Sequence, residues 1–365
     1  MTRQELENLR TQIDKLDRDV LKLLNRRMAL SEEIGRLKTS QGQEVVDSDR
    51  EEKILRHLIS LNAGPLPEKT LRAVYREIFS GSRALQMPLT VAFLGPAGTY
   101  CYEAALEKFG GSASLIPCST VGEVFEEVGR GGVTLGVVPA ENSIEGSVRE
   151  TLDFLMTSGT EVCGEISVRI SHALMNLTGR TEDIRTVVSH PQALAQCRRW
   201  LTGRFPEIPL QESSSTAHAA QKAAEDLGVA AIANERLAER LGLQVIRRGI
   251  QDKAENITRF LVLGDLKPAR TGNDKTAIVF WTEDRPGSLY RLLEKFAEYD
   301  INLTRIESRP DRGAMPWKYA FFVDLEGHRD DPKVADCLKE LSSRCALIKV
   351  LGSFAINSGS GLPPA

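Results

Sequence analysis

Long apolar runs are absent from this chain of 365 residues, and so are the patterns of several large protein classes. No stretch of about 18 consecutive apolar residues occurs, which excludes a membrane-spanning helix. The opening residues, MTRQELENLR, hold no apolar core of a secretory signal, so we expect a cytoplasmic protein without a membrane partner. The six cysteines form no CxxC pair, which favours reduced thiols over a disulfide framework or a zinc site.

Fingerprints of cofactor and nucleic-acid binding are missing as well. The chain contains neither GxGxxG nor GxxxxGK followed by Ser or Thr, which argues against a nicotinamide dehydrogenase and a nucleotide phosphate enzyme. The 47 Lys and Arg residues against 50 Asp and Glu residues give a formal charge of −3, which excludes a broadly basic surface for nucleic acid. We therefore expect no metal, no organic cofactor and no nucleic-acid partner.

What is present divides into three segments with different patterns. Residues 1–87 are helical throughout, residues 88–267 alternate apolar runs with helical stretches, and residues 274–355 read as strand, helix, strand, strand, helix, strand. Residues 356–365 are rich in Gly, Ser and Pro and are expected to form a flexible tail. This predicts a multidomain chain with an all-α part, an α/β part and an α+β, ferredoxin-like part.

In the first segment, apolar residues recur at alternating spacings of three and four from Leu6 to Leu37, the pattern of a coiled-coil seam. A helix of that length, roughly 48 Å, needs a partner along its whole seam. Two shorter helices are expected over about 48–61 and 67–86. One oversized helix with two short ones predicts an intertwined homodimer or a larger homo-oligomer.

Arg27 occupies a seam position where Leu or Ile is expected. A buried guanidinium is costly without a counter-ion, so either a carboxylate of the protein or an anionic ligand should meet it. Lys38 lies on nearly the same helix face, about 16 Å away, whereas Arg10 is about 25 Å from Arg27 and could reach the same ligand only from a second chain. The alternative is an ordinary coiled-coil seam with Arg27 at a polar layer.

Further polar side chains are spaced to share helix faces. Asp47, Arg50 and Glu51 are three and four apart on the second helix, and Ser82 and Gln86 are four apart on the third. Such pairs are common on solvated surfaces, but beside the seam arginine they predict a cationic pocket for a small, rigid dianion with a hydroxyl. Without a nucleophile–base pair or a metal cluster, catalysis there would depend on positioning and charge complementarity.

The first segment contains LRTQIDKLDRDVLKLLNRRMALSEEIGRLK followed by VVDSDREEKIL. Over about residues 4–86 it resembles the all-helical chorismate mutase domain of bacterial fused enzymes, which implies rearrangement of chorismate to prephenate. Lys38 and Gln86 are the implied catalytic residues, because they would donate hydrogen bonds to the ether oxygen as the C–O bond breaks. The residues implied to bind substrate are Arg10 from the partner chain, Arg27, Lys38, Asp47, Arg50, Glu51, Ser82 and Gln86.

The second segment carries polar loops next to apolar runs. The runs LTVAFLG, LGVVPA, RTVVSH, VAAIAN and RFLVLG predict a largely parallel sheet, whose ligands lie beyond the carboxyl ends of the strands. GPAGTY, PAENSIEG, SHPQ and SSSTA fall at such ends, whereas ENITRF precedes its strand. His190 could be a general acid or base, or simply begin a helix, and Cys197 could be a nucleophile or a buried small side chain.

The order and spacing of these motifs, together with LGPAGTY and NITRF, resemble those of prephenate dehydratases over about residues 89–266. This implies two lobes like those of a periplasmic binding protein, with loss of water and CO2 from prephenate in the cleft between them. Thr258 is the implied hydroxyl that assists departure, Arg259 is either a carboxylate clamp or a structural ion pair, and Cys101 replaces a Ser or Thr usual in the family. The implied cleft residues are Glu141, Asn142, Ser143, Ser189, His190, Gln196, Cys197, Ser215, Thr216, Thr258, Arg259 and Phe260.

The third segment has no catalytic constellation, so a dimerisation module is the simplest interpretation of its βαββαβ order. DRPGSLY and ESRP resemble the ACT domain attached to these dehydratases, which implies binding of the effector L-phenylalanine at a domain dimer interface. The residues implied to contact it are Gly287, Ser288, Leu289, Glu307, Ser308, Arg309 and Pro310.

The combined interpretation is a bifunctional chorismate mutase–prephenate dehydratase of L-phenylalanine biosynthesis, feedback-inhibited through an ACT domain. One rival joins the mutase to a dehydrogenase, which the missing dinucleotide fingerprint disfavours. Another rival is a ligand sensor without turnover, and the second segment is more open to that interpretation because binding folds and dehydratase folds look alike.

Overall fold

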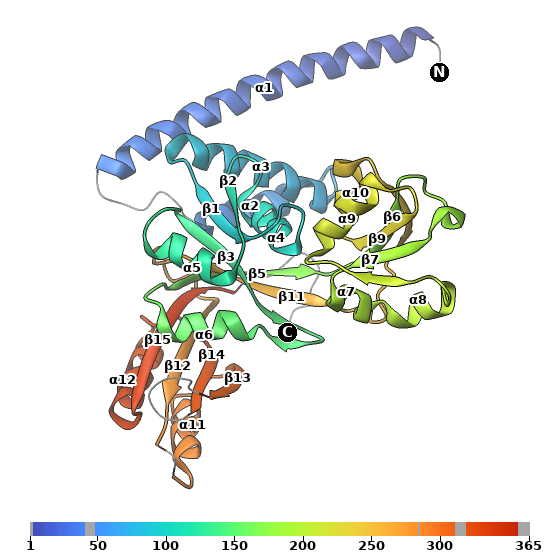
Figure 1. Ribbon diagram of the computed structural model, residues 1–365. Helices are drawn as coiled ribbons and strands as arrows, with labels where there is room; N and C mark the ends of the chain where they lie inside the picture. The colour runs from blue at the N-terminus through green and yellow to red at the C-terminus, as the bar shows by residue number, and fades with distance from the viewer. Residues whose placement is uncertain (1–2, 41–47, 284, 311–318, 357–365) are drawn as a thin grey trace. The chain divides into compact units, whose positions relative to one another are not determined.

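The computed structural model describes residues 3–40, 48–283, 285–310 and 319–356 of the chain (Figure 1). It separates into two compact units, one formed by Met1–Thr90 with Leu106–Ser114 and the other by Val91–Ala105 with Leu115–Ala365. None of the helices in the described residues is both long enough and apolar enough to cross a membrane.

The first unit contains the three predicted helices, α1 (Arg3–Ser40), α2 (Ser48–Leu61) and α3 (Glu68–Gln86). α3 begins directly after Pro67 and ends before Met87 and Pro88, as expected for a helix bounded by prolines. α1 packs on α3 at a glycine: a Cβ on Gly35 would lie 2.6 Å from Cγ of Gln86. The end of α3 can therefore approach α1 closely only where α1 lacks a side chain.

The apolar seam of α1 is left uncovered within one chain. Figure 1 shows the N-terminal half of this helix projecting away from α2 and α3, and every residue from Arg3 to Leu23 is exposed. Leu16 is 63% exposed and Leu23 66% exposed, although both lie in the predicted seam. A helix that presents so many leucines to water is typical of a coiled-coil partner.

The middle segment contributes two sheets, and the first has the order β2-β1-β3-β11-β5, with β4 paired to β3. Its strands are β1 (Thr90–Leu94), β2 (Ser114–Cys118), β3 (Leu135–Asn142), β4 (Gly146–Ser147), β5 (Val162–Arg169) and β11 (Ile257–Leu263). β1 and β3 are parallel, but β11 is antiparallel to both β3 and β5. The chain leaves this sheet at Arg169 and returns beside it at Ile257, so β11 must run in the opposite direction.

The second sheet has the order β10-β6-β9-β7-β8. Its strands are β6 (Ala173–Asn176), β7 (Thr186–Ser189), β8 (Leu210–Glu212), β9 (Val229–Ala233) and β10 (Gln244–Arg248). β7 is parallel to β8 and β9, whereas β6 is antiparallel to β9 and β10. The expectation of a largely parallel sheet is thus wrong, because both sheets are mixed.

Helices flank the two sheets of the middle segment. They are α4 (Tyr100–Phe109), α5 (Val121–Gly129), α6 (Arg149–Thr157), the 3-10 turn η1 (Thr181–Asp183), α7 (Pro191–Gln196), α8 (Arg198–Arg204), α9 (Thr216–Glu225) and α10 (Arg236–Leu241). The second sheet is covered by small side chains on one face, with Ala217, Ala219 and Ala220 of α9 all buried. Short side chains let the helix backbone lie close to the strands.

The third sheet has the order β13-β14-β12-β15 and is antiparallel throughout. It is built from β12 (Asp274–Trp281), β13 (Leu303–Pro310), β14 (Tyr319–Glu326) and β15 (Leu347–Ala355), with α11 (Ser288–Glu298) and α12 (Pro332–Arg344) between them. This order confirms the predicted βαββαβ pattern. ENITRF does not precede its strand, however, because β11 already begins at Ile257.

Side chains of the third sheet alternate between two cores. Val323 and Leu325 of β14 pack with α11 and α12, whereas Ala320 and Phe322 join a core that includes Leu152 and Leu155 of α6. Because successive residues of a strand point to opposite faces, one face of this sheet is covered by its own helices and the other by the first sheet and α6. The first sheet of the middle segment and the third sheet therefore share one core.

β15 approaches β5 closely at a glycine. A Cβ placed on Gly352 would overlap the carbonyl oxygen of Val162, at the first residue of β5. Backbone atoms cannot move aside as a flexible side chain can, so only glycine fits at this position while the third sheet stays docked.

We predict that Gly352→Ala lowers the free energy of unfolding of the second unit by about 1–3 kcal/mol, since the added methyl group must separate β15 from β5. Denaturant unfolding of the full chain measures this. Gly159→Ala is the matched control, because no atom lies within 4 Å of a Cβ at that glycine. Equal stability of the two variants would contradict the close packing of the third sheet.

Candidate active sites

The seam arginine meets a hydroxyl and an aromatic ring within its own chain. Nη1 of Arg27 donates to Oγ of Ser82 at 2.5 Å, and its guanidinium lies 5.3 Å from the centre of the Phe79 ring. Ser82 also accepts from Ser31 and donates to the carbonyl of Ile78. Arg27 is half-buried, and among the described residues no carboxylate pairs with it.

Glu51 of α2 is held by an arginine that sequence reasoning missed. Nη1 of Arg83 lies 2.6 Å and 2.5 Å from the two carboxylate oxygens of Glu51, and Nη2 donates to the carbonyl of Phe109 at 2.8 Å. Arg83 is only 7% exposed, so this pair is part of the packing between α2 and α3. Its spacing of four residues from Phe79 on the apolar face of α3 was the available signal, because a buried arginine needs a partner.

The structure places the other predicted mutase residues in different parts of the first unit. Lys38 is half-buried one turn after Gly35, where Gln86 packs, so the two implied catalytic side chains lie near each other. Arg10 is far along the exposed part of the helix and pairs with Glu7 at 3.5 Å. Arg50 is exposed at the start of α2, and Asp47 lies outside the described residues.

In the middle segment, two crossings join the first and second sheets, at residues 170–172 and 249–256, and polar side chains gather around them. Asn142, at the end of β3, donates from Nδ2 to Oδ1 of Asn256 at 2.7 Å and to Oγ1 of Thr258 at 2.8 Å. Its Oδ1 accepts from the backbone amides of Ile144 and Glu145. Asn142 therefore joins the loop after β3 to the beginning of β11.

The same network continues to the second sheet. Nδ2 of Asn256 donates to Oε1 of Gln196 at 2.9 Å, and that oxygen also lies 2.9 Å from Nε2 of His172. Nε2 of Gln196 donates to Glu145 at 2.8 Å. Burial lowers the pKa of His172 and so favours its neutral ring. Sequence reasoning missed both residues. His172 lies outside every motif named above, and Asn256 is the first residue of NITRF, of which only Thr258, Arg259 and Phe260 were assigned to the cleft.

Several predicted cleft residues begin helices or hold loops. His190 is the N-cap of α7 and accepts from the amide of Gln192, and Ser215 is the N-cap of α9, which begins at Thr216. Ser143 accepts from the amide of Ile257 at 3.0 Å. For His190, this geometry matches the helix-starting alternative, and N-capping satisfies backbone amides that would otherwise lack partners.

Four further residues face the interior. Phe260 is 2% exposed, and Ser189 is fully buried and donates to the carbonyl of Ile232 at 2.6 Å. Cys101 and Cys197 are buried, and burial raises the pKa of each thiol to about 12. The thiol of Cys101 donates to the carbonyl of Val137 at 3.1 Å, a contact that a serine hydroxyl could also make. Cys197 thus has the features of a packed side chain and not of a nucleophile.

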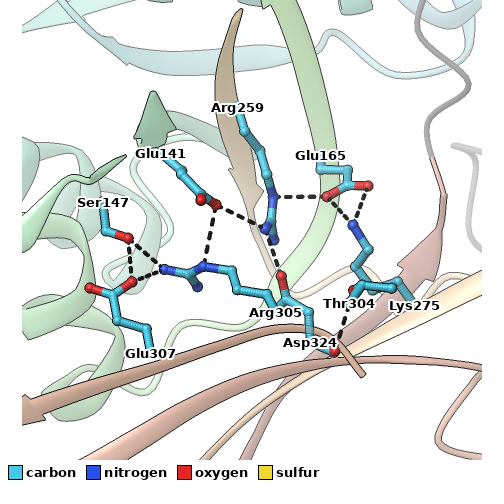
Figure 2. Close-up of polar contacts among 9 residues, drawn as sticks. All are labelled: Glu141, Ser147, Glu165, Arg259, Lys275, Thr304, Arg305, Glu307 and Asp324. Carbon is cyan, nitrogen blue, oxygen red and sulfur yellow. Dashed lines mark hydrogen bonds and ion pairs between the residues drawn. The ribbon is translucent and has the colours of Figure 1, made fainter. Parts of the chain in front are cut away.

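Arg259 is surrounded by carboxylates (Figure 2). Its Nε lies 2.9 Å from Glu165, and its Nη1 lies 2.6 Å from Asp324 and 3.7 Å from Glu141. Burial opposes protonation of the guanidinium, but Asp324 and Glu165 outweigh it and raise the pKa of Arg259. Of the two roles left open by the sequence, this geometry favours the structural ion pair.

The residues implied to contact the effector lie at two places in the third sheet. Gly287 adopts a left-handed conformation (φ 79°) before α11, and Ser288 and Leu289 form the first turn of that helix. On β13, Glu307 pairs with Arg305 and accepts from Ser147, while Arg309 pairs with Asp153 at 2.5 Å. Ser308 and Pro310 are exposed. Two of the implied effector contacts are thus also contacts to the middle segment.

No candidate metal site is found in the part of the chain that the structure describes. No three side chains of His, Cys, Asp or Glu come together there in a way that could hold an ion. The polar groups that are available are amides, hydroxyls, guanidinium groups and carboxylates, which act through hydrogen bonds and charge.

We predict that Cys101 and Cys197 do not react with iodoacetamide at pH 8 in the native protein. Only the thiolate is a nucleophile, and a thiol with a pKa of about 12 is almost entirely protonated at that pH. Mass spectrometry of peptides from native and denatured protein measures the labelling. Both residues should be labelled after denaturation, and rapid labelling of native Cys197 would instead support a reactive thiol.

Comparison with known proteins identifies the family of this chain. Three family models match in succession: chorismate mutase type II over residues 9–87, prephenate dehydratase over 91–268 and the ACT domain over 276–343. A bifunctional chorismate mutase/prephenate dehydratase of Aquifex aeolicus is 43% identical over 357 residues, which cover 96% of this chain and 98% of that protein.

Two solved structures are similar to the part of the chain beyond the first helices. A prephenate dehydratase of Arthrobacter aurescens in complex with L-Phe is 36% identical, has a TM-score of 0.69, and aligns over 76% of this chain and 93% of its own. GqqA, described as a quorum-quenching acylase, is 30% identical with a TM-score of 0.67, over 74% of this chain and 98% of its own. The full-length likeness to the Aquifex aeolicus protein, with three domain matches in the same order, shows that the chain belongs to the bifunctional chorismate mutase/prephenate dehydratases.

Proposed function

We propose which side chains perform the two reactions of this enzyme, and that it acts in the cytoplasm as a homodimer or larger assembly inhibited by L-phenylalanine. The helical domain (1–87) rearranges chorismate to prephenate, and the dehydratase domain (88–267) removes water and CO2 to give phenylpyruvate. The ACT domain (274–355) holds the effector. The observation that carries the assignment is Arg27, which is half-buried against Ser82 and Phe79 and has no carboxylate partner among the described residues.

In the mutase site, cations bind the two carboxylates of chorismate, and hydrogen-bond donors act on the breaking bond. Arg27 and Lys38 come from one chain, and Arg10 comes from its partner. Lys38 and Gln86 donate to the ether oxygen, where negative charge grows in the transition state, so they stabilise it more than the ground state. Asp47, Arg50, Glu51 and Ser82 line the pocket, with Glu51 oriented by Arg83.

The exposed seam of α1 supports the dimer. Leu16 and Leu23 are more than half exposed in one chain, and burying such side chains contributes roughly 1.5–3 kcal/mol each. A second α1 packed along the seam would bury them and bring Arg10 of the partner to the pocket of Arg27. The mutase site would then be complete only in the assembly.

In the dehydratase site, Thr258 assists departure of the substrate hydroxyl. Because Asn142 donates to Oγ1 of Thr258, the threonine proton stays available for the leaving oxygen. Aromatisation of the ring drives the step, so the enzyme needs mainly to orient the substrate and to donate one hydrogen bond. Glu141, Ser143, Gln196 and the N-caps His190 and Ser215 belong to the same cleft, and Ser189, Cys197, Thr216 and Phe260 support its wall.

The experiment that tests the whole proposal uses chorismate and no added cofactor. Purified protein should convert chorismate through prephenate to phenylpyruvate, and L-phenylalanine should suppress the second step. Liquid chromatography of the three compounds over time measures both reactions. Accumulation of prephenate without phenylpyruvate would contradict the dehydratase assignment, and rates unchanged by L-phenylalanine would contradict the effector.

We predict that Arg10→Ala and Lys38→Ala are each inactive as mutases and that co-refolding them restores about a quarter of the wild-type rate. Half of the dimers formed at random are mixed, and each mixed dimer has one complete site of two. The chorismate mutase rate of the mixture measures this. Arg10→Ala mixed with the double variant Arg10→Ala/Lys38→Ala is the control that must stay inactive, and an equally inactive test mixture would rule out a shared site.

We predict that Thr258→Val lowers the dehydratase kcat by about 100-fold or more, since it removes the proton donor and keeps the shape of the side chain. Thr258→Ser is the matched control and should retain most activity. The mutase rate of the same preparations should stay unchanged. A fully active Thr258→Val enzyme would exclude this hydroxyl from catalysis.

A further inference from the structure

A cluster of charged side chains joins the dehydratase and ACT domains beside the proposed dehydratase site. Figure 2 shows side chains from strands of the first sheet and from the third sheet pointing toward one another, while Thr304 donates to the carbonyl of Asp324 within the third sheet. The dehydratase residues are Glu141, Ser147, Glu165 and Arg259, and the ACT residues are Lys275, Thr304, Arg305, Glu307 and Asp324.

These charges stand at positions that strand alternation would make apolar. Asp324 continues the stripe of Ala320 and Phe322 on β14, and Lys275 continues the stripe of Ala277 and Val279 on β12. Asp324 is 3% exposed, so its charge is stable only if it is paired. The docking face of the ACT sheet is therefore apolar along most of its length and ionic at one end.

One half of the cluster is held from several sides. Arg259 is fixed between Glu165 and Asp324, and Nζ of Lys275 lies 3.0 Å from both carboxylate oxygens of Glu165. Glu165, Asp324 and Lys275 are each less than one-sixth exposed. Moving any one of these groups would leave a buried charge without its partner, so this half is rigid.

The other half is built around Arg305, on an edge strand. Among the strands that the structure describes, β13 pairs only with β14, and its register shifts between Leu303 and Arg305, which redirects the side chain at that point. Nε of Arg305 lies 3.2 Å from Glu141, its Nη2 donates to Ser147 at 2.8 Å, and it pairs with Glu307. Arg305 thus connects an implied effector residue to two residues of the dehydratase domain.

Glu141 is shared between the two halves. Its Oε2 lies 3.2 Å from Nε of Arg305 and 3.7 Å from Nη1 of Arg259. It directly precedes Asn142, the residue that donates to Thr258. A change in the contact between Arg305 and Glu141 would therefore occur one residue away from Asn142, which donates the hydrogen bond to Thr258.

We propose that Arg305 is the positioning residue through which the ACT domain acts on the dehydratase site, by setting the carboxylate of Glu141. The proposal deepens the proposed function and depends on it. A ligand whose ammonium group engages Glu307 draws that carboxylate away from Arg305, and Arg305 then shifts its hold on Glu141. Ligand and substrate are coupled to the extent that each prefers a different arrangement of this shared carboxylate.

The alternative is a structural latch, by which we mean that the cluster only holds the two domains together. Other ion pairs join the same two domains and allow this alternative to be tested. Nη2 of Arg329 lies 2.8 Å from Oε2 of Glu161, directly before β5, with no contact to Glu141 or Arg259 in the described residues. Breaking the Arg329–Glu161 pair weakens docking without touching the shared carboxylate. Glu161→Gln is therefore the matched control for Arg305→Gln.

The test measures binding and inhibition separately in the full-length enzyme. Calorimetry gives the Kd of L-phenylalanine, and the dehydratase assay gives the degree of inhibition. In Arg305→Gln we expect a Kd within about threefold of the wild-type value and inhibition weakened by about tenfold or more, each rate being compared with the uninhibited rate of the same variant. Glu161→Gln should be inhibited like the wild type.

Ser147→Ala is a second variant that reaches the same contact from the dehydratase side. It removes a hydroxyl held by Arg305 and Glu307, and we expect it to weaken inhibition in the same direction as Arg305→Gln. Full inhibition of Arg305→Gln would overturn the proposal. Loss of L-phenylalanine binding in that variant would also overturn it, since Arg305 would then belong to the effector site.

Failure of the proposed function has a different signature. If L-phenylalanine does not bind the wild-type enzyme, the effector assignment is wrong, and so is the proposed coupling through Arg305. If it binds and inhibits the wild type and Arg305→Gln equally, the effector assignment stands and only the role of Arg305 is wrong. Loss of inhibition in Glu161→Gln to the same extent would favour the latch.

Discussion

The buried guanidinium of Arg259 ties together three strands from two domains. It lies on β11 and needs the carboxylates of Glu165 on β5 and Asp324 on β14, while Lys275 balances Glu165 from the other side. Removing one partner of a buried pair costs about 3–5 kcal/mol, because the remaining charge is left uncompensated. The position of β11, and with it that of Thr258, is consequently tied to the docking of the ACT sheet.

The same strand also closes the path between the two sheets of the dehydratase domain. β11 returns from the second sheet and enters the first between β3 and β5. This places Asn256, at the crossing, within hydrogen-bond distance of Asn142 and Gln196, which lie more than 50 residues apart in sequence. Buried amides of this kind are stable only when all their partners are present, so the network is formed as a unit.

The first unit has a different constraint, because its longest helix is only partly covered by the other two helices. α1 is about 57 Å long at the usual rise per residue, and α3 packs against its C-terminal half only. The residues of α1 that meet α3 include Arg27, Ser31 and Gly35, together with the apolar Met28. A partly polar contact surface within the chain and an apolar seam left exposed are consistent with a catalytic pocket completed by another chain.

Local patterns in the sequence were sufficient for the helices of the first segment and for the order of elements in the third. The three-and-four spacing from Leu6 to Leu37 predicts α1, and the βαββαβ order of the ACT domain follows from strand and helix periods alone, since both depend on near neighbours. The direction of β11, the partner of Glu51 and the surroundings of Arg259 depended on the tertiary structure. Each joins residues far apart in the chain, and the energy of a buried charge depends on its partners, not on its own position in the sequence.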